Sequence, residues 1–545
     1  MTFVADPQLV DPHTYPGRPW PLSTLTVRYT DLYLWRVYSL LQKRLYPDTT
    51  IFLGDLFDGG REWGTGATES GDKRWKEYGE QFWLSEYKRF SKIFFDTWID
   101  AGVKYQDDPV RRRQLLSNLP GNHDLGFATG ILKPVKRRFN AYFGDGNRVD
   151  VVGNHTFISV DTVSLSAKEY SDSDPEIWLP ASDFLAGIQD TTRKALNSEL
   201  SLRQGLNPNP AYRHAIYQGD GLPESGLPKP DLQDLAQLPT VLLTHVPLYR
   251  DRGTPCGPYR EHWPPSLDSF GLPLDSDERN AIAVAAGYQY QNVLTRELSR
   301  EITEAIGNVR YAFSGDDHDY CEVVHHAYPS AGSGIREITV KSLSWAMGVR
   351  RPGFVMLSMW NPIDDKGNSI GGVKRDTIQS HLCLLPDQLA IFIRYGLLFV
   401  LTLSLLLLRA GHYSLNPAKS AFGGSESPVL PVVREAMPGG VQKADDTPNG
   451  SSLSSERQGL SARYLNSRPR SVSPQKGGYG LPAPLIERAG YYGSKEDKEV
   501  VIHTKIKSKS RRLKGLKLFY IEFQWSIIKV AFPVLAWYLW LLRSW

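Results

Sequence analysis

The chain has 545 residues, of which 41% are hydrophobic and 22% charged, and its formal net charge is +4. This composition is typical of a globular protein, and a charge so close to balance gives no support for nucleic acid as a partner. The length allows two or three domains. The spacing of the three cysteines, Cys256, Cys321 and Cys383, matches no zinc module, and a Cys256–Cys321 disulfide in an oxidising compartment remains open. Cys321 is interpreted as a packing residue near the site described next.

Five short apolar runs in the first 320 residues are each followed by a polar block. The runs cover residues 2–5, 51–53, 115–116, 241–243 and 311–313 and predict buried strands. The blocks contain Asp6 and Gln8, then Asp55 and Asp58, then Asn122, His123 and Asp124, then His245, and finally Asp316 and His318. Each block alone is usually structural, and Gly-Asn-His-Asp alone suits a turn. All of them together, at the carboxyl ends of strands, predict one crevice that holds two divalent cations.

Apolar residues at helical spacing predict helices over residues 28–46, 74–101 and 281–306. Strands that alternate with helices predict an α/β fold. Residues 165–239 form a long insertion with acidic stretches rich in Pro and Gly, and a second irregular stretch covers residues 250–274. Loops this long in an enzyme often bind substrate, and Arg250, Tyr259, Arg260 and His262 suit a glycan or a phosphate. A disordered surface insertion explains residues 218–234 equally well.

The second part of the chain predicts membrane association. Residues 389–408 read LAIFIRYGLLFVLTLSLLLL, which is long enough to cross a bilayer. We therefore predict one large domain over 1–360, a connector over 361–388 and a transmembrane helix over 389–409. A disordered loop rich in Ser, Pro and Gly follows over 410–517. Residues 518–542 contain Glu522, Lys529 and Pro533, so they predict a second transmembrane helix or an interfacial one.

The five blocks, in this order, resemble the calcineurin-like metallophosphoesterases, whose pattern is D-x-H, GD-x-x-D, GNH-D/E, H and GH-x-H. The resemblance covers about residues 1–360 and implies a two-sheet sandwich flanked by helices. Two positions depart from the pattern, because Gln8 and Asp316 each stand where a histidine is expected. Both changes replace a nitrogen ligand by an oxygen ligand, which favours manganese or magnesium over zinc.

The resemblance also implies a role for each residue. Asp55 bridges two metal ions, with Asp6, Gln8 and His318 at the first and Asn122, His245 and Asp316 at the second. A hydroxide shared by the cations attacks phosphorus, and His123 protonates the leaving alkoxide. Asp58 and Asp124 do not bind the metal ions themselves but orient the residues that do.

Residues 340–354 resemble the membrane-bound branch of this family that remodels GPI anchors, including fungal cell-division-control metallophosphoesterases and ethanolamine-phosphate phosphodiesterases. Residues 54–62 and 314–321 also resemble the fungal members. The branch implies that the enzyme removes ethanolamine-phosphate from a mannose of a GPI-anchored glycolipid or protein. We expect it to use two divalent metal ions and expect these ions to be Mn²⁺.

Charge predicts the sidedness of the membrane segments. The basic run over residues 503–517 suits an anionic cytoplasmic leaflet, although a solvated linker has the same composition. The large domain then faces the lumen of the endoplasmic reticulum or Golgi, where Asn154 lies in a glycosylation sequon. Family members carry a membrane anchor ahead of the first strand, so we expect the amino terminus to be truncated.

Two alternatives stay open. One is a phosphatase of a membrane lipid. The other is a catalytically weak membrane protein that binds cargo or senses manganese, an idea that depends on Gln8 and Asp316. The intact Asp55, Asn122, His123, His245 and His318 favour an enzyme.

Overall fold

The computed structural model describes residues 1–103, 113–203, 237–275, 277–332, 334–370, 376–422 and 515–543. Two compact units make up the chain, Met1–Gly396 and Leu397–Trp545. Part of the predicted insertion, residues 204–236, and most of the predicted basic loop, residues 423–514, lie outside the described residues.

The first unit contains a five-stranded sheet in the order β13-β12-β1-β2-β3. Its strands are β1 (Thr2–Val4), β2 (Thr49–Phe52), β3 (Gln114–Leu116), β12 (Gly353–Met359) and β13 (Ile378–Leu384). β1, β2 and β3 run parallel, with Phe3 opposite Ile51. β13 pairs with β12 as the edge strand, so the sheet continues past residue 360 into the segment predicted to be a connector.

The second sheet has six strands in the order β10-β11-β9-β6-β5-β4. They are β4 (Arg148–Val152), β5 (His155–Ser159), β6 (Thr240–Leu243), β9 (Val309–Ser314), β10 (Cys321–His325) and β11 (Ile335–Thr339). β5, β6, β9 and β11 are parallel. All five strands predicted from the apolar runs are therefore confirmed, each within a few residues of the expected bounds.

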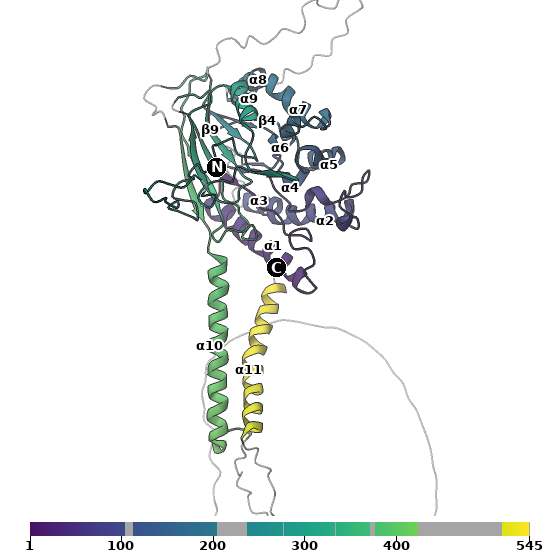
Figure 1. The fold of residues 1–545 in the computed structure, drawn as a ribbon, viewed down its shortest axis with the longest axis vertical. Coiled ribbons are helices and arrows are strands. Elements are labelled where there is room, and N and C mark those ends of the chain that lie inside the picture. The colour runs from purple at the N-terminus through teal and green to yellow at the C-terminus, as the bar shows by residue number, and fades with distance from the viewer. Residues whose placement is uncertain are drawn as a thin grey trace, which may run out of the picture. The chain divides into compact units, whose positions relative to one another are not determined.

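The two sheets pack face to face because alternate residues of each strand point to opposite sides. Phe3 and Ile51 of the first sheet join Val241 and Phe313 of the second in one buried cluster, and the Phe3 and Phe313 ring centroids are 4.4 Å apart. Val4 and Phe52 point the other way and pack with side chains of the helices. The predicted sandwich flanked by helices is confirmed (Figure 1).

Helices cover the outer faces of the sandwich. α1 (Leu22–Leu40) ends in a π-turn over Leu41–Leu45. α2 (Glu80–Phe90) runs through a π-turn over Ser91–Phe95 into α3 (Asp96–Val103), so the helix predicted over 74–101 begins later than expected. The remaining helices of this unit are α4 (Asn122–Leu125), α5 (Lys133–Phe143), α6 (Thr162–Leu165), α7 (Pro175–Ala186), α8 (Ile188–Arg203) and α9 (Arg296–Ile306).

Two predictions about irregular and helical segments were wrong. Residues 175–203 of the predicted insertion form α7 and α8 rather than a loop. Conversely, the helix predicted over 281–306 is helical only from Arg296, after Thr295 caps it by accepting a hydrogen bond from the Leu298 amide at 3.2 Å. The hairpin of β7 (Ala286–Gly287) and β8 (Tyr290–Gln291) precedes it, and its turn contacts the candidate site.

Two helices are long and apolar enough to cross a membrane. They are α10 (Gln388–Leu415), with a mean hydropathy of 2.3, and α11 (Leu516–Arg543), with 1.3. Many apolar side chains of α10 are exposed among the described residues, as is expected of a membrane span and not of a core helix. Length and composition thus agree with the predicted spans.

Candidate metal centre and active site

The polar blocks predicted from sequence meet at one edge of the sandwich, beyond the carboxyl ends of β1, β2, β3, β6 and β9. Asp6, Gln8, Asp55, Asp316 and His318 all have positive φ angles, of 45°, 28°, 50°, 70° and 66°. Such left-handed backbone costs about 1–3 kcal/mol at a non-glycine residue and is concentrated at functional sites. These strained positions follow closely after the ends of β1, β2 and β9, where the polar side chains gather in one cluster.

His245 presents one nitrogen to the centre of this cluster. Its Nδ1 lies 2.8 Å from the carbonyl oxygen of Leu53, which can only accept, so Nδ1 carries the proton. Its Nε2 then offers a lone pair and lies 3.2 Å from Asn122 Oδ1, 3.4 Å from Asp55 Oδ1 and 3.6 Å from Asp316 Oδ1. A histidine fixed by a backbone carbonyl in this way is oriented as a metal ligand.

The buried oxygens of the cluster need a positive partner. Asp6 and Gln8 are fully buried, and Asp6 Oδ2 and Gln8 Oε1 have no hydrogen-bond partner among the described residues. Gln8 Nε2 donates to Asp55 Oδ2 at 2.7 Å, while the Asp316 amide donates to Asp6 Oδ1 at 3.2 Å. Burial and the nearby carboxylates of Asp55 and Asp316 raise the pKa of Asp6 well above its usual range. Cations at this position would relieve that repulsion.

The donor set fits two divalent cations. Asp6, Asp55 and His245 each place a ligand atom within 4.8 Å of the others. Burial lowers the pKa of the His318 imidazole, and a neutral imidazole is the form that binds metal. The other side chains of the cluster supply carboxylate or amide oxygens, so the centre is richer in oxygen than in nitrogen.

Gln289 supports this site and was missed by the sequence analysis. Its carbonyl oxygen accepts a hydrogen bond from Asn122 Nδ2 at 3.0 Å, which leaves Asn122 Oδ1 facing His245. Its side-chain Oε1 accepts from the Phe127 amide at 2.6 Å. Gln289 lies in the turn between β7 and β8, with φ of 64°, inside the segment predicted to be helical. Gly287, in the middle of that helical pattern, was the available signal for a turn.

Asp124, predicted to act from behind the ligands, connects two of the blocks. Its carboxylate accepts hydrogen bonds from the amides of Leu56 at 3.0 Å, Phe57 at 3.1 Å and Gly121 at 2.9 Å. Burial and the charge of Asp55 raise the pKa of Asp124 to about 7. The loop after β2 is thereby held against the start of α4.

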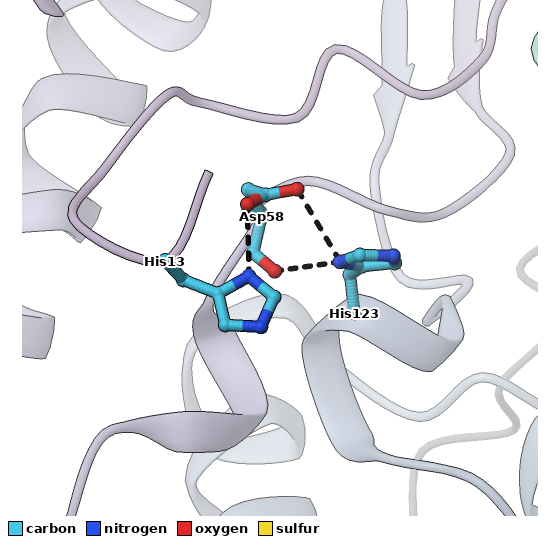
Figure 2. Close-up of side chains that lie close together, drawn as sticks. All are labelled: His13, Asp58 and His123. Atoms are coloured by element: carbon cyan, nitrogen blue, oxygen red, sulfur yellow. Dashed lines mark hydrogen bonds and ion pairs between the residues drawn. The ribbon is translucent and has the colours of Figure 1, made fainter. Parts of the chain in front are cut away.

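A second cluster lies beside the first and contains His13, Asp58 and His123 (Figure 2). His13 Nδ1 is 3.0 Å from Asp58 Oδ2, and His123 Nδ1 is 2.6 Å from the Asp58 carbonyl oxygen and 3.4 Å from Oδ1. Burial raises the pKa of Asp58, but the hydrogen bond from His13 and the charge of His123 outweigh it and lower the pKa to about 2. Asp58 is thus an ionised carboxylate between two imidazoles. His13 was missed by the sequence analysis.

The residues expected to contact substrate divide into two groups. The prediction for Arg250 was wrong, because its buried guanidinium is 2.6 Å from Glu337 Oε2 and also contacts Cys321 Sγ. Arg260 is also largely buried and pairs with Asp317 at 2.5 Å, next to Asp316, so it holds the ligand loop. Tyr259 and His262 are exposed, and their contact with substrate stays a prediction. The Cys256–Cys321 disulfide, which the sequence left open, is present and joins the irregular stretch over residues 250–274 to β10.

Comparison with known proteins adds a family. The chain is 34% identical over 405 residues to Cell division control protein 1 of Saccharomyces cerevisiae, covering 72% of the chain and 63% of that relative. It is 26% identical over 324 residues to Metallophosphoesterase 1 of Ailuropoda melanoleuca, covering 59% of the chain and 62% of that relative. These relatives support the calcineurin-like metallophosphoesterase family that the five blocks resemble.

The chain spans about three fifths of the length of these two relatives. A crystal structure of a dimetal phosphatase from Danio rerio is 13% identical, covers 66% of the chain and 92% of that structure, and has a TM-score of 0.27. No protein-family model matches the chain.

Proposed function

We propose that this metallophosphoesterase is a membrane-tethered phosphodiesterase that removes ethanolamine-phosphate from a mannose of a GPI glycan. The observation that carries the hydrolytic part is the buried donor cluster beside the Asp58–His123 pair, in which Asp6 Oδ2 and Gln8 Oε1 have no partner among the described residues. The substrate rests on the resemblance of residues 340–354 to the GPI-remodelling branch.

The residues divide the chemistry between them. Asp55 lies between Gln8 and His245 and suits a bridge between two cations, with Asp6, Gln8 and His318 on one side and Asn122, His245 and Asp316 on the other. Bound divalent cations would neutralise the phosphoryl oxygens and lower the pKa of a bound water. The oxygen-rich donor set favours manganese.

His123 is placed to give a proton to the leaving oxygen. Its Nδ1 donates to the Asp58 carbonyl oxygen at 2.6 Å, so the doubly protonated ring would carry the proton that goes to the leaving oxygen on Nε2. Its main-chain amide also donates to Asp55 Oδ1 at 2.9 Å, which ties the proton donor to the proposed bridging ligand. An alkoxide leaves slowly unless it is protonated, so this step is worth roughly 10²–10⁴-fold.

The test is hydrolysis by the purified full chain in detergent, stripped of metal and then supplied with Mn²⁺. We expect release of ethanolamine-phosphate from a GPI glycan, and a matched phosphatidic acid assay distinguishes a lipid phosphatase. Selective release of inorganic phosphate from the lipid would favour that alternative. Manganese binding without turnover of either substrate would favour the binding protein.

The membrane placement is tested separately. We propose that residues 1–388 face the lumen of the endoplasmic reticulum or Golgi and that the basic loop faces the cytoplasm. Protease added to sealed microsomes should cut between α10 and α11 and spare the sandwich. Digestion of the sandwich in intact vesicles would place the site in the cytoplasm and exclude a lumenal GPI substrate.

A further inference from the structure

His13 lies in the loop after β1 and reaches the same carboxylate that supports His123. Both imidazoles contact Asp58 in Figure 2, and their ring centroids are 6.0 Å apart in an edge-to-face arrangement. The His13 and His123 side chains are 22% and 24% exposed, whereas Asp58 is 7% exposed. The two rings therefore face the open side of the site, with the shared carboxylate behind them.

The His13 ring is held in place by its own loop. Asp11, which is buried, accepts a hydrogen bond from the His13 amide with Oδ1 and one from the Gly59 amide with Oδ2, both at 2.8 Å. A side chain at Gly59 would collide with Asp11 Oδ2 and His13 Cβ, so glycine lets the two loops close together. The Trp75 ring, with its centroid 5.8 Å from that of His13, limits movement of the ring.

The hydrogen bonds define where the protons lie. An ionised carboxylate only accepts, so His13 Nδ1 carries a proton toward Asp58 Oδ2, as His123 Nδ1 does toward the Asp58 carbonyl. Both Nδ1 atoms are therefore donors rather than free lone pairs, which argues against a cation bound between them and Asp58. In this arrangement His13 restrains the Asp58 carboxylate, and Asp58 in turn orients the His123 imidazole.

We propose that His13 is a positioning residue for His123, which it serves by holding the shared Asp58 carboxylate in place. This inference rests on the proposed function. Without His13, Asp58 Oδ2 loses the hydrogen bond from the imidazole, and the carboxylate is held less firmly against His123. The proton donor would then be misaligned while the metal ligands stay intact.

The experiment compares two kinds of leaving group in the full chain with Mn²⁺. For His13→Ala, kcat/KM should fall roughly 10–100-fold on glycerophosphoethanolamine, whose alkoxide needs a proton, and less than about 3-fold on bis-p-nitrophenyl phosphate, whose phenolate does not. His13→Asn should recover most of the loss, because its amide can replace Nδ1 as the donor to Asp58. The exposed His326 offers the matched control, and His326→Ala should leave both substrates unaffected.

A double-mutant cycle shows whether His13 acts through His123. In a His123→Ala background, adding His13→Ala should cause no further loss on the alkyl substrate. A further loss of the same size would overturn the proposal and assign His13 a direct contact with substrate. A fall in bound manganese in His13→Ala, measured by mass spectrometry, would instead make His13 a ligand.

Failure of this inference is distinct from failure of the proposed function. An active wild type with equal losses on both substrates in His13→Ala would overturn the positioning role alone. A wild-type chain without turnover on either substrate would overturn the proposed function and the role of His13 with it.

Discussion

Two buried carboxylates of the sandwich, Glu337 and Asp6, are equally removed from solvent and differ in how their charge is balanced. Glu337 on β11 accepts hydrogen bonds from the Leu248 amide and Ser314 Oγ, both at 3.0 Å. Arg250 at 2.6 Å and His325 at 2.7 Å complete its partners. Asp6, beyond β1, accepts one amide, and its Oδ2 has no partner among the described residues.

The difference separates a structural carboxylate from a functional one. Burial raises the pKa of Glu337, but Arg250 and the hydrogen bond from His325 outweigh it and hold the pKa below its usual value. Burial and two neighbouring carboxylates raise the pKa of Asp6 by more than the nearby His245 lowers it. A group with all its partners in the protein stabilises the fold, while one that lacks them requires an external cation.

The largest expected effect comes from the bridging position of the cation cluster. Asp55→Asn should lower turnover by roughly 10³-fold or more, because both cations lose a charged ligand that contributes several kcal/mol to catalysis. The thermal midpoint of the metal-free protein should change little, since no part of the core depends on this charge. Metal content and activity are the measurements, with Asp150→Asn on β4 as the control. Near-normal turnover by folded Asp55→Asn would contradict a dinuclear centre.

Glu337→Gln should act on stability and leave the metal centre intact. Removal of one partner from a buried pair costs about 3 kcal/mol in the free energy of unfolding, because the Arg250 charge remains buried. Denaturant unfolding measures this loss. The exposed Arg252–Glu278 pair is the control, and Glu278→Gln should cost less than about 1 kcal/mol. A large loss of bound manganese in Glu337→Gln would show that Glu337 also supports the metal centre, which contradicts a purely structural role for this carboxylate.

The same variant predicts a pH dependence. The pKa of Glu337 in the folded chain lies below its ordinary value of 4.5, so the ionised form is stabilised by folding. This contribution is fully present above pH 4.5 and is lost as the pH falls through the lower folded pKa. The difference in unfolding free energy between wild type and Glu337→Gln should therefore shrink below pH 4.5. If this difference in unfolding free energy grew on acidification, the pKa of Glu337 would be raised by folding, which contradicts the prediction.

The smallest effect concerns metal preference. Stripped enzyme should regain more turnover with Mn²⁺ than with Zn²⁺, because Gln8 and Asp316 supply oxygen where the family pattern has histidine nitrogen. Gln8→His should raise activity with zinc relative to manganese by about tenfold, equivalent to roughly 1.4 kcal/mol. Titration of the apo-protein with each ion measures the ratio. A wild type that prefers zinc would show that these two residues do not tune the centre.

Local sequence was sufficient to predict the elements whose pattern is local. Apolar runs at 2–5, 51–53 and 311–313 are strands because only a buried sheet accommodates them, and polar residues directly after parallel strands must share one edge. The order of Asp6, Asp55, Asn122, His245 and Asp316 was therefore enough to predict that they converge. Helix periodicity failed over residues 281–295, where Gln289 accepts hydrogen bonds from Asn122 of α4 and from Phe127 in the loop after it.

Only the tertiary structure decided the partners of the charged side chains. Arg250 and Arg260 appeared equally suited to a phosphate, yet each pairs with a carboxylate far along the chain, Glu337 and Asp317. His13 gained its role from Asp58, which is 45 residues away and is brought close by the Asp11–Gly59 contact. An ion pair or a shared carboxylate depends on distances between residues that are remote in sequence, and those distances exist only after the two sheets have packed.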